Sequence, residues 1–313
     1  MQTCVIGGAG FIGGYLVDAL LASGRDVTVL GRRQERPGSM NVAARYQTFD
    51  FEDKIGFRQH MADCAEIVDL SYASVPKTSF SAPLFDIESN LPPFIALLEE
   101  AKHLPRLRKL VVTSSGGTIY GPARKLPITE ECETRPISPY GITKLAIERY
   151  AMMFHLLASL PVTIVRPANA YGLGQKPFSG QGFVATAIGH ILKREPVTIF
   201  GETGTIRDYI HVRDIAAGIL CAMEHTSAGE IYNLGTGVGH SNLEVLSKLG
   251  VLAERDEFPI TIDCVEPRGF DVAANVLSHE KLFRHTGWKP KTSLETGLLE
   301  MWEGMSALAK SDG

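Results

Sequence analysis

A tyrosine and a lysine stand four residues apart in the stretch YGITK, at Tyr140 and Lys144. On a helix this spacing places both side chains on one face, one turn apart. A phenol has an unperturbed pKa of about 10 and is a poor base at neutral pH unless a neighbouring cation stabilises the phenolate. The pair is therefore a candidate general base with its activating ammonium, although the same spacing also occurs on surface helices that have no catalytic role.

Hydroxyl side chains precede this pair in the stretch TSSGGTIYG, residues 113–121, which follows the apolar run KLVV. A buried hydroxyl needs a hydrogen-bond partner, so hydroxyls are an unusual choice for packing at the end of a buried strand. The hydroxyl residues are Thr113, Ser114, Ser115 and Thr118. They form either a polar turn or a group from which one hydroxyl contacts a substrate.

Three glycines near the N-terminus, Gly7, Gly10 and Gly13, have the spacing G-x-x-G-x-x-G directly after the first apolar run. Glycine permits a tight turn, close approach of a pyrophosphate to the backbone, and close packing of the next helix, whose N-terminus supplies N–H donors. In the order strand, turn, helix, this spacing favours a dinucleotide site over a simple glycine-rich turn.

The end of the second apolar run, VTVL, bears on which dinucleotide is bound. NAD sites normally carry an acidic residue here for the ribose hydroxyls, whereas this chain has Gly31, Arg32 and Arg33. Without the carboxylate, a 2′-phosphate meets no repulsion, and a guanidinium can pair with it. The stretch favours NADP but leaves NAD open, and a solvated basic turn is the alternative. Asp50, after the next predicted strand, is either an adenine contact or a cap.

Apolar runs alternate with amphipathic stretches through the first half of the chain. The runs TCVIG, DVTVLG, AEIVDLS, LRKLVVTSS and PVTIVRP are separated by segments of helical character. Continuous apolar strands joined by helices are typical of a parallel sheet covered on both faces. We therefore predict an α/β fold: a Rossmann-type doubly wound parallel sheet over residues 1–170, and a smaller α/β substrate domain over residues 171–313 that partly returns to the first.

Composition and charge narrow the range of partners. The net charge is -4 and no basic run exceeds two residues, which argues against nucleic acid. No apolar run approaches the roughly 18 residues that span a bilayer, so we expect no membrane partner. The five cysteines are scattered, without CxxC pairs, which predicts reduced thiols in a cytoplasm and no metal site.

Motifs along nearly the whole chain carry a family resemblance. They are GGAGFIG at 7–13, Asn90, SSGGTIYG at 114–121, SPYGITK at 138–144, RPANAYG at 166–172, VTIFG at 197–201, GTIRDYIHVRD at 204–214, YNLGTG at 232–237, PRGFD at 267–271 and TGWKP at 286–290. Together they resemble the extended short-chain dehydrogenases/reductases of the nucleotide-sugar epimerase/dehydratase group, and among these the UDP-hexose 4-epimerases.

The resemblance implies a nucleotide-sugar 4-epimerase with a tightly bound NAD or NADP, acting on UDP-glucose and UDP-galactose or on UDP-N-acetylhexosamines. In such enzymes the tyrosinate, here Tyr140, takes the proton of the sugar C4 hydroxyl while the C4 hydride moves to the nicotinamide. The 4-keto sugar then rotates, and the hydride returns to its opposite face. Lys144 would lower the pKa of Tyr140 and hold the nicotinamide ribose. The alternative is an NADP(H)-dependent 4-keto-sugar reductase, which the stretch from Gly31 to Arg33 would suit.

The resemblance also implies the ligand contacts. The predicted cofactor-binding residues are Gly7, Gly10, Phe11, Ile12, Gly13, Arg32, Arg33, Asp50, Tyr72, Asn90, Tyr140, Lys144 and Pro167. The predicted substrate-binding residues are Asn169 near the phosphates, Arg207 and Arg268 as guanidinium clamps, Asp271 at the ribose, Val184 and Phe200 at the uracil, and Asn275 at the sugar. For the charged residues, a surface ion pair is the alternative. Because Asn275 is of modest size, we expect tolerance of N-acetylated sugars.

One position of the hydroxyl-rich turn departs from the family. Similar epimerases carry a Ser or Thr four residues before the tyrosine of this turn, and its hydroxyl shares a hydrogen bond with the sugar. Here that position is Gly116, so the hydroxyl must come from Thr118, Ser115 or water. We favour Thr118, because two glycines let the turn re-aim it. Similar dehydratases and decarboxylases carry acids where this chain has Gly117 and Thr118, so both reactions are rejected.

Two predicted helices are apolar on more than one face, through Phe94, Leu98, Met152, Met153 and Leu156. One face must cover the sheet. The second either forms a two-fold four-helix contact like that of similar enzymes, giving a homodimer, or is buried within the monomer.

Overall fold

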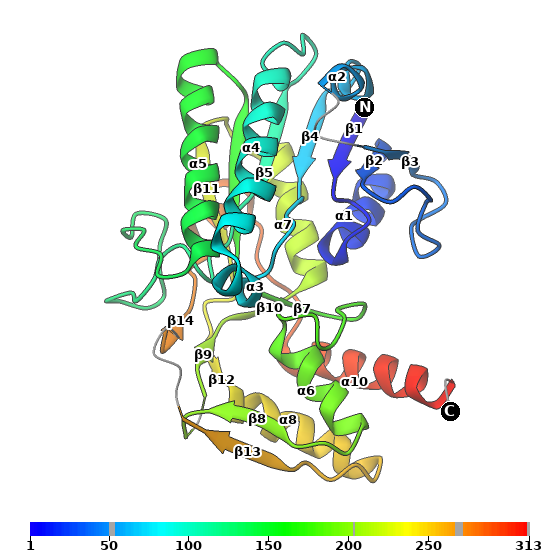
Figure 1. Cartoon of the computed structure of the whole chain (residues 1–313), viewed down its shortest axis with the longest axis vertical. Helices are drawn as coiled ribbons and strands as arrows, with labels where there is room; N and C mark the ends of the chain where they lie inside the picture. Colours follow the sequence, from blue (N-terminus) through cyan, green and yellow to red (C-terminus); the bar gives the residue numbers. More distant parts are fainter. Residues whose placement is uncertain (50–53, 203, 267–271, 312–313) are drawn as a thin grey trace.

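The computed structural model describes residues 1–49, 54–202, 204–266 and 272–311. Its central strands are β1 (Gln2–Ile6), β2 (Asp26–Gly31), β3 (Arg45–Thr48), β4 (Glu66–Asp69), β5 (Lys109–Thr113), β6 (Val162–Pro167) and β11 (Glu230–Leu234). They form one parallel seven-stranded sheet in the order β11-β6-β5-β4-β1-β2-β3 (Figure 1). The order reverses between β1 and β4, which opens a crevice at their carboxyl ends. The predicted doubly wound α/β fold is confirmed.

Helices cover both faces of this sheet. On one face lie α1 (Phe11–Ala22), α7 (Val212–His225) and α9 (Glu280–Thr286), and on the other lie α2 (Lys54–Met61), α4 (Pro83–Ala101) and α5 (Pro139–Ala158). Side chains alternate along the strands: in β1, Val5 joins the core under α1 and α7, whereas Cys4 and Ile6 join the core under α4 and α5. The short α3 (Pro76–Ser81) packs on the N-terminal parts of α4 and α5. This two-sided burial explains why the strand sequences are apolar throughout.

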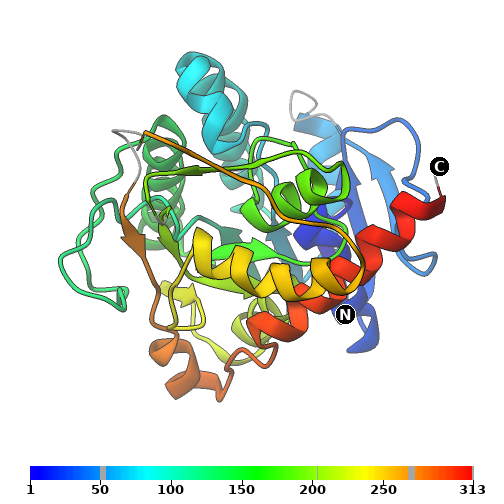
Figure 2. The same cartoon turned by 90° about the horizontal axis from the view of Figure 1, so that it is seen from below.

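A smaller lobe lies beyond the carboxyl edge of the sheet. Its core is formed by α6 (Phe183–Leu192), α8 (Asn242–Arg255) and α10 (Leu294–Ser311), which lie together in Figure 2. Trp302 of α10 is buried in this core. Short strands complete it: β7 (Asn169–Tyr171) with β10 (Tyr209–His211), β8 (Val197–Phe200) with β13 (Ile262–Val265), and β9 (Ile206–Arg207) between β12 (His240–Ser241) and β14 (Ala274–Asn275). No helix within the described ranges has both the length and the apolar character to cross a membrane.

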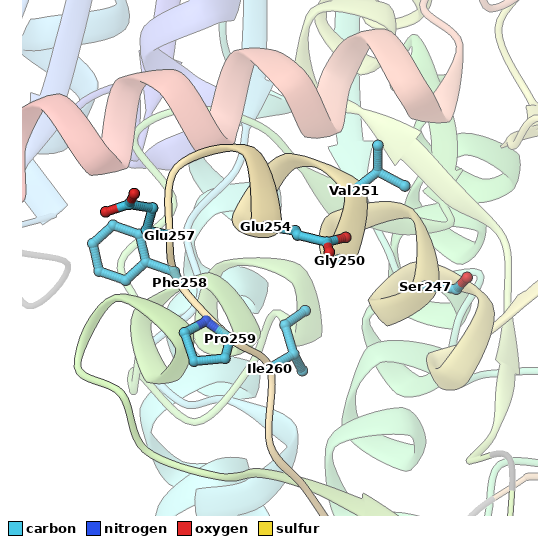
Figure 3. Close-up of a pocket in the computed structure, with 8 residues that line it drawn as sticks. All are labelled: Ser247, Gly250, Val251, Glu254, Glu257, Phe258, Pro259 and Ile260. Carbon is cyan, nitrogen blue, oxygen red and sulfur yellow. The ribbon is translucent and has the colours of Figure 1, made fainter.

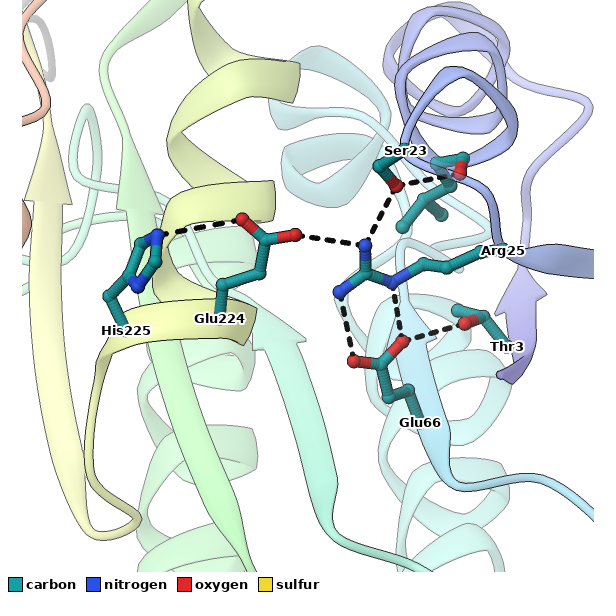
Figure 4. Close-up of polar contacts among 7 residues, drawn as sticks. Thr3, Ser23, Arg25, Glu66, Glu224 and His225 are labelled. Atoms are coloured by element: carbon teal, nitrogen blue, oxygen red, sulfur yellow. Dashed lines mark hydrogen bonds and ion pairs between the residues drawn. The ribbon is translucent and has the colours of Figure 1, made fainter.

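An ion-pair network links neighbouring elements at the amino end of the sheet, opposite the crevice (Figure 4). Arg25 donates from Nε to Glu66 at 2.7 Å and from a terminal nitrogen to Glu224 on α7 at 2.9 Å. Thr3 of β1 donates its hydroxyl to the same Glu66 at 2.7 Å. Because this cluster joins β1, β4 and α7 far from the crevice, we assign it to stability.

Candidate active site

A cavity of about 470 Å³ opens at the carboxyl ends of β1, β2, β4 and β5. Seven predicted cofactor-binding residues line it: Gly7, Gly10, Arg32, Arg33, Tyr72, Asn90 and Lys144. Phe11, Ile12 and Gly13 lie behind it in the first turn of α1, and Pro167 ends β6. Asp50 lies outside the described residues.

The glycine turn at the floor of the cavity fits a pyrophosphate. Gly7 has φ +77°, and a Cβ there would lie 3.1 Å from the backbone of Leu70. A Cβ on Gly13 would lie 2.6 Å from the Gly7 carbonyl oxygen, so only glycine lets α1 pack this closely. Gly10 caps α1 without a side-chain hydrogen bond, which leaves the first N–H groups of the helix for a ligand. The residues present therefore fit a dinucleotide.

The far end of the cavity lacks room for the acidic residue typical of NAD sites. A Cβ on Gly31 would lie 2.7 Å from the hydroxyl of Tyr46, which itself donates to the Arg33 carbonyl at 2.9 Å. The side chains of Arg32 and Arg33 are exposed, and neither has an ion-pair partner among the residues that the structure describes. Tyr46 thus fills the position of the missing carboxylate, a role that the sequence did not indicate.

Tyr140 and Lys144 lie in the first two turns of α5, and Lys144 lines the cavity. The helix begins with Ser138, whose hydroxyl accepts a hydrogen bond from Gly141 N at 3.1 Å. Lys144 is 5% exposed and donates to the Thr113 carbonyl at 2.9 Å. Burial lowers the pKa of Lys144 to about 8, against the opposing effect of nearby carboxylates. A buried ammonium is therefore held next to the candidate base.

The phenol of Tyr140 is in contact with the hydroxyl-rich turn through Ser115. Burial raises the pKa of Tyr140, and a hydrogen bond with the Ser115 side chain acts in the opposite direction. The hydroxyl oxygen of Thr118 is also buried, but it has no hydrogen-bond partner within the described part of the chain. The structure therefore brings Ser115, rather than Thr118, to the candidate base.

Tertiary contacts exclude a side chain at Gly116, where the family carries its hydroxyl. A Cβ there would meet the Leu277 side chain and lie 2.9 Å from the Arg166 carbonyl oxygen. The Gly116 carbonyl accepts a hydrogen bond from Asn275 Nδ2 at 3.1 Å. Gly116 and Asn275 are thus direct neighbours.

A buried ion pair supports α5 one turn beyond Lys144. Glu148 accepts two hydrogen bonds from Arg166 of β6, at 2.9 and 2.6 Å. Arg166 also donates to the Tyr120 hydroxyl at 2.8 Å, which donates in turn to Asn233 of β11 at 2.7 Å. The network joins α5, β6, β11 and the hydroxyl-rich turn, so it fixes the base relative to that turn.

The predicted substrate-binding residues fall in the second lobe or at its junction with the sheet. Asn169 begins β7, with its side chain near Gly117, and Phe200 ends β8 half-buried. Arg207 of β9 pairs in register with Asn275 of β14 and donates to the Val272 carbonyl at 2.7 Å. Val184 lies in the core of the lobe. Arg268 and Asp271 lie outside the described residues.

Some residues of the cavity were missed from the sequence. Asp69, the last residue of β4, and Ser71 line it, and Asp69 accepts from the Ser71 backbone at 2.9 Å. The sequence could have indicated them, because it places a carboxylate and a hydroxyl at the carboxyl end of a predicted strand. Asp86, buried in α4, contacts Tyr72 and gave no such signal.

A second depression of about 540 Å³ lies on the small lobe, away from this cavity (Figure 3). It is lined by α8 and the segment that follows it, with Val251, Phe258, Pro259 and Ile260 among apolar groups and Glu254 and Glu257 as its charges. Within the described residues, no cluster of three or more His, Cys, Asp or Glu side chains could hold a metal ion. We assign no site to this depression.

A dinucleotide cradle at the crevice of a doubly wound sheet, with a buried lysine in its lining and a half-buried tyrosine one helical turn away, defines a nicotinamide-dependent enzyme. The profile of the NAD dependent epimerase/dehydratase family matches residues 3–235, and the chain belongs to this family. The predicted family is thereby confirmed.

Two relatives and two solved structures illustrate the similarity. The UDP-glucose 4-epimerase of Mycolicibacterium smegmatis is 32% identical over 97% of this chain and 98% of its own length. A putative UDP-glucose 4-epimerase of Methanocaldococcus jannaschii is 31% identical over 94% and 95%. The Thermotoga maritima UDP-glucose 4-epimerase, solved with UDP-glucose, superimposes with a TM-score of 0.90 at 32% identity over 98% and 99% of the two chains. The Thermus thermophilus UDP-glucose 4-epimerase, solved with NAD, gives 0.88 at 32% identity over 97% and 98%.

Proposed function

We propose that this protein is a nucleotide-sugar 4-epimerase that interconverts UDP-linked hexoses by transient oxidation at C4. The observation that carries the proposal is the group of Tyr140, Lys144 and Ser115, of which Lys144 lines the dinucleotide cavity. Relatives named UDP-glucose 4-epimerase over nearly the whole length, and a similar structure that holds UDP-glucose, support this reaction over a reductase.

Each residue of this group would have its own role in the proposed epimerisation. A nicotinamide held by the residues that line the cavity would supply hydride-transfer chemistry at C4. Tyr140 removes the proton of the C4 hydroxyl and restores it at the end of the cycle. Because burial opposes the phenolate, the ammonium of Lys144 and the hydroxyl of Ser115 must stabilise it. Lys144 is buried, and Tyr140 and Ser115 are half-buried, which would limit the access of water to the oxidised sugar.

The nucleotide end would be held by the small lobe. We assign Asn169 to the diphosphate, Arg207 and Arg268 to its negative charge, and Asp271 to the ribose. Phe200 would face the uracil, with Val184 supporting it from the core of the lobe. Arg207 supports this assignment, because its half-buried side chain lies on β9 beside Asn275, at the junction of the two lobes.

For the cofactor we propose NADP rather than the NAD found in similar structures. A Cβ on Gly31 would clash with the Tyr46 hydroxyl in its present position, and two exposed guanidiniums line the same end of the cavity. The mass of the dinucleotide released from denatured protein tests the proposal. NADP is expected from the wild type and should be lost from an Arg32→Ala/Arg33→Ala variant, whereas NAD in both would overturn it.

For the sugar we propose that N-acetylated hexoses are accepted. Asn275 is 1% exposed and its amide is fixed to the Gly116 carbonyl, so it leaves more room than a large aromatic side chain would. Comparable turnover of UDP-N-acetylglucosamine and UDP-glucose is expected. Strict rejection of the acetylated sugar would contradict the proposal.

We propose a homodimer formed by the outer faces of α4 and α5. Phe94 and Leu98 belong to the core under these helices, but Met153 is 40% and Leu156 75% exposed. An exposed apolar strip on paired helices suits a self-complementary contact. Light scattering should give twice the chain mass, and a Met153→Glu/Leu156→Glu variant should be monomeric. A monomeric wild type would refute the contact.

We place the enzyme in the cytoplasm, because five unpaired thiols suit a reducing compartment. Activity confined to the soluble fraction of its native cells after lysis, and absent from the periplasmic or secreted fraction, is the expected result.

The activity itself is tested with purified protein and UDP-glucose or UDP-galactose, without any added reductant. Interconversion to an equilibrium mixture is expected, and Tyr140→Phe should bind the UDP-sugar without converting it. Conversion that needs stoichiometric NADPH and a 4-keto sugar would instead identify a reductase.

A further inference from the structure

A second tyrosine lies inside the active centre, between the candidate base and its lysine. Tyr72 follows β4, and its ring centroid lies 4.8 Å from that of Tyr140, with the ring planes at 66°. The ammonium of Lys144 lies 4.1 Å from the Tyr72 ring centroid, but 5.9 Å from that of Tyr140. The cation is therefore seated on the face of Tyr72, at a distance typical of a cation–π contact.

Tyr72 is held in this orientation by a buried carboxylate. Asp86, in the first turn of α4, is 0% exposed and accepts from the Tyr72 hydroxyl, at 3.3 Å to each carboxylate oxygen. Ser74 donates its hydroxyl to the same carboxylate. Asn90, one turn further along α4, donates to the Asp86 carbonyl at 2.7 Å and accepts from Ala73 N at 2.7 Å. The segment that carries Tyr72 is thus bound to α4 at several points.

The charges around this group come from three elements. Asp69 at the end of β4, Glu148 on α5 and Asp86 on α4 all favour the ammonium of Lys144. Asp86 also raises the pKa of Tyr140, so it opposes the phenolate directly. Burial and Asp86 raise the pKa of Tyr72, so this phenol stays neutral and acts as a donor, not as a base.

We propose that Tyr72 and Asp86 are positioning residues for the reaction: Asp86 orients the ring of Tyr72, and that ring keeps the Lys144 ammonium where it can stabilise the Tyr140 phenolate. The proposal rests on the proposed function, because it concerns the base of that reaction. It is independent of the contact between Lys144 and the Thr113 carbonyl, which holds the same ammonium from the side of the sheet.

The test is the pH profile of kcat for the holoenzyme with UDP-glucose. Tyr72→Leu removes the ring that the Lys144 ammonium contacts, so the Tyr140 phenolate loses stabilisation. The acid limb of the kcat profile, where kcat rises with pH, should therefore move to higher pH by about one unit. Tyr72→Phe keeps the ring but loses the hydrogen bond to Asp86 that orients it, so its acid limb should move up by less than that of Tyr72→Leu. The KM should change less than about twofold in both, because neither variant is expected to alter uniform substrate binding.

A second variant gives a shift of opposite sign. Asp86→Asn keeps an oxygen that can accept from Tyr72 but removes the charge that opposes the phenolate, so the acid limb should move down. The matched control is Tyr232→Leu, because Tyr232 is a buried ring 5.1 Å from the Lys281 ammonium, remote from the cavity. Its limb should coincide with that of the wild type.

Three results would overturn the proposal: an unmoved limb in Tyr72→Leu, an unmoved limb in Asp86→Asn, or a loss of kcat that is uniform across pH. If Tyr72→Leu does not fold, Tyr72→Met replaces it, because an unbranched side chain fills irregular gaps. A wild type without epimerase activity would refute the proposed function instead, so the two failures are distinguishable.

Discussion

Replacing Ser115 with alanine should cost most of the activity while leaving the fold intact. In the structure the Ser115 hydroxyl is the side-chain group whose hydrogen bond lowers the pKa of Tyr140. A hydrogen bond to a charged group contributes about 1.5–3 kcal/mol. Because each 1.36 kcal/mol is about tenfold in rate, kcat should fall by about 10- to 150-fold. The acid limb of the kcat profile should also move to higher pH, because the phenolate loses a donor.

Thr118→Val is the matched control for Ser115→Ala. The Thr118 hydroxyl has no hydrogen-bond partner within the described ranges, and valine has nearly the same shape. Its kcat should stay within about twofold of the wild type, since no hydrogen bond to the base is removed. The assay is conversion of UDP-galactose to UDP-glucose by purified holoenzyme, measured from pH 5 to 9. A large loss in Thr118→Val with little loss in Ser115→Ala would refute the assignment.

Three further predictions concern the surroundings of the base. Gly116→Ser should not raise kcat and should lower the free energy of unfolding by about 1–3 kcal/mol in urea, because the new side chain meets Leu277 and the Arg166 carbonyl; a gain in kcat would contradict this. Glu148→Gln should lower the free energy of unfolding by about 3–5 kcal/mol, because Arg166 loses its buried counter-charge. Its control is Glu133→Gln, which removes an exposed ion pair with Arg135 and should leave the urea midpoint unchanged. Equal destabilisation by the two variants would argue against a special contribution of the buried Glu148 pair. The wild-type kcat/KM should fall as pH rises through about 8, where Lys144 loses its proton, and Lys144→Arg should remove this basic limb; persistence of the limb would assign it to another group.

The fold and the main catalytic pair could be predicted because their signals are local. Continuous Val and Ile strands, the glycines from Gly7 to Gly13, and the helical spacing of Tyr140 and Lys144 each depend on a few neighbouring residues. The same holds for the basic end of β2, although the reason that Gly31 excludes a carboxylate is Tyr46 on the next strand.

The remainder of the site depends on contacts between distant segments. The choice between Ser115 and Thr118 follows from the path of the turn, which Leu277 and Asn275 constrain at Gly116. The contact between the Lys144 ammonium and the Tyr72 ring likewise forms only where β4, α4 and α5 come together. A helical apolar stripe does not reveal which face meets the sheet, and Phe94 proved to face the core.

The central claim is that a hydride leaves C4 of the sugar and returns to the same carbon within one enzyme complex. Purified protein, given UDP-glucose deuterated at C4 and no added dinucleotide, should produce UDP-galactose that retains the deuterium at C4. Loss of the deuterium to solvent, or conversion only when a reductant is supplied, would contradict the mechanism.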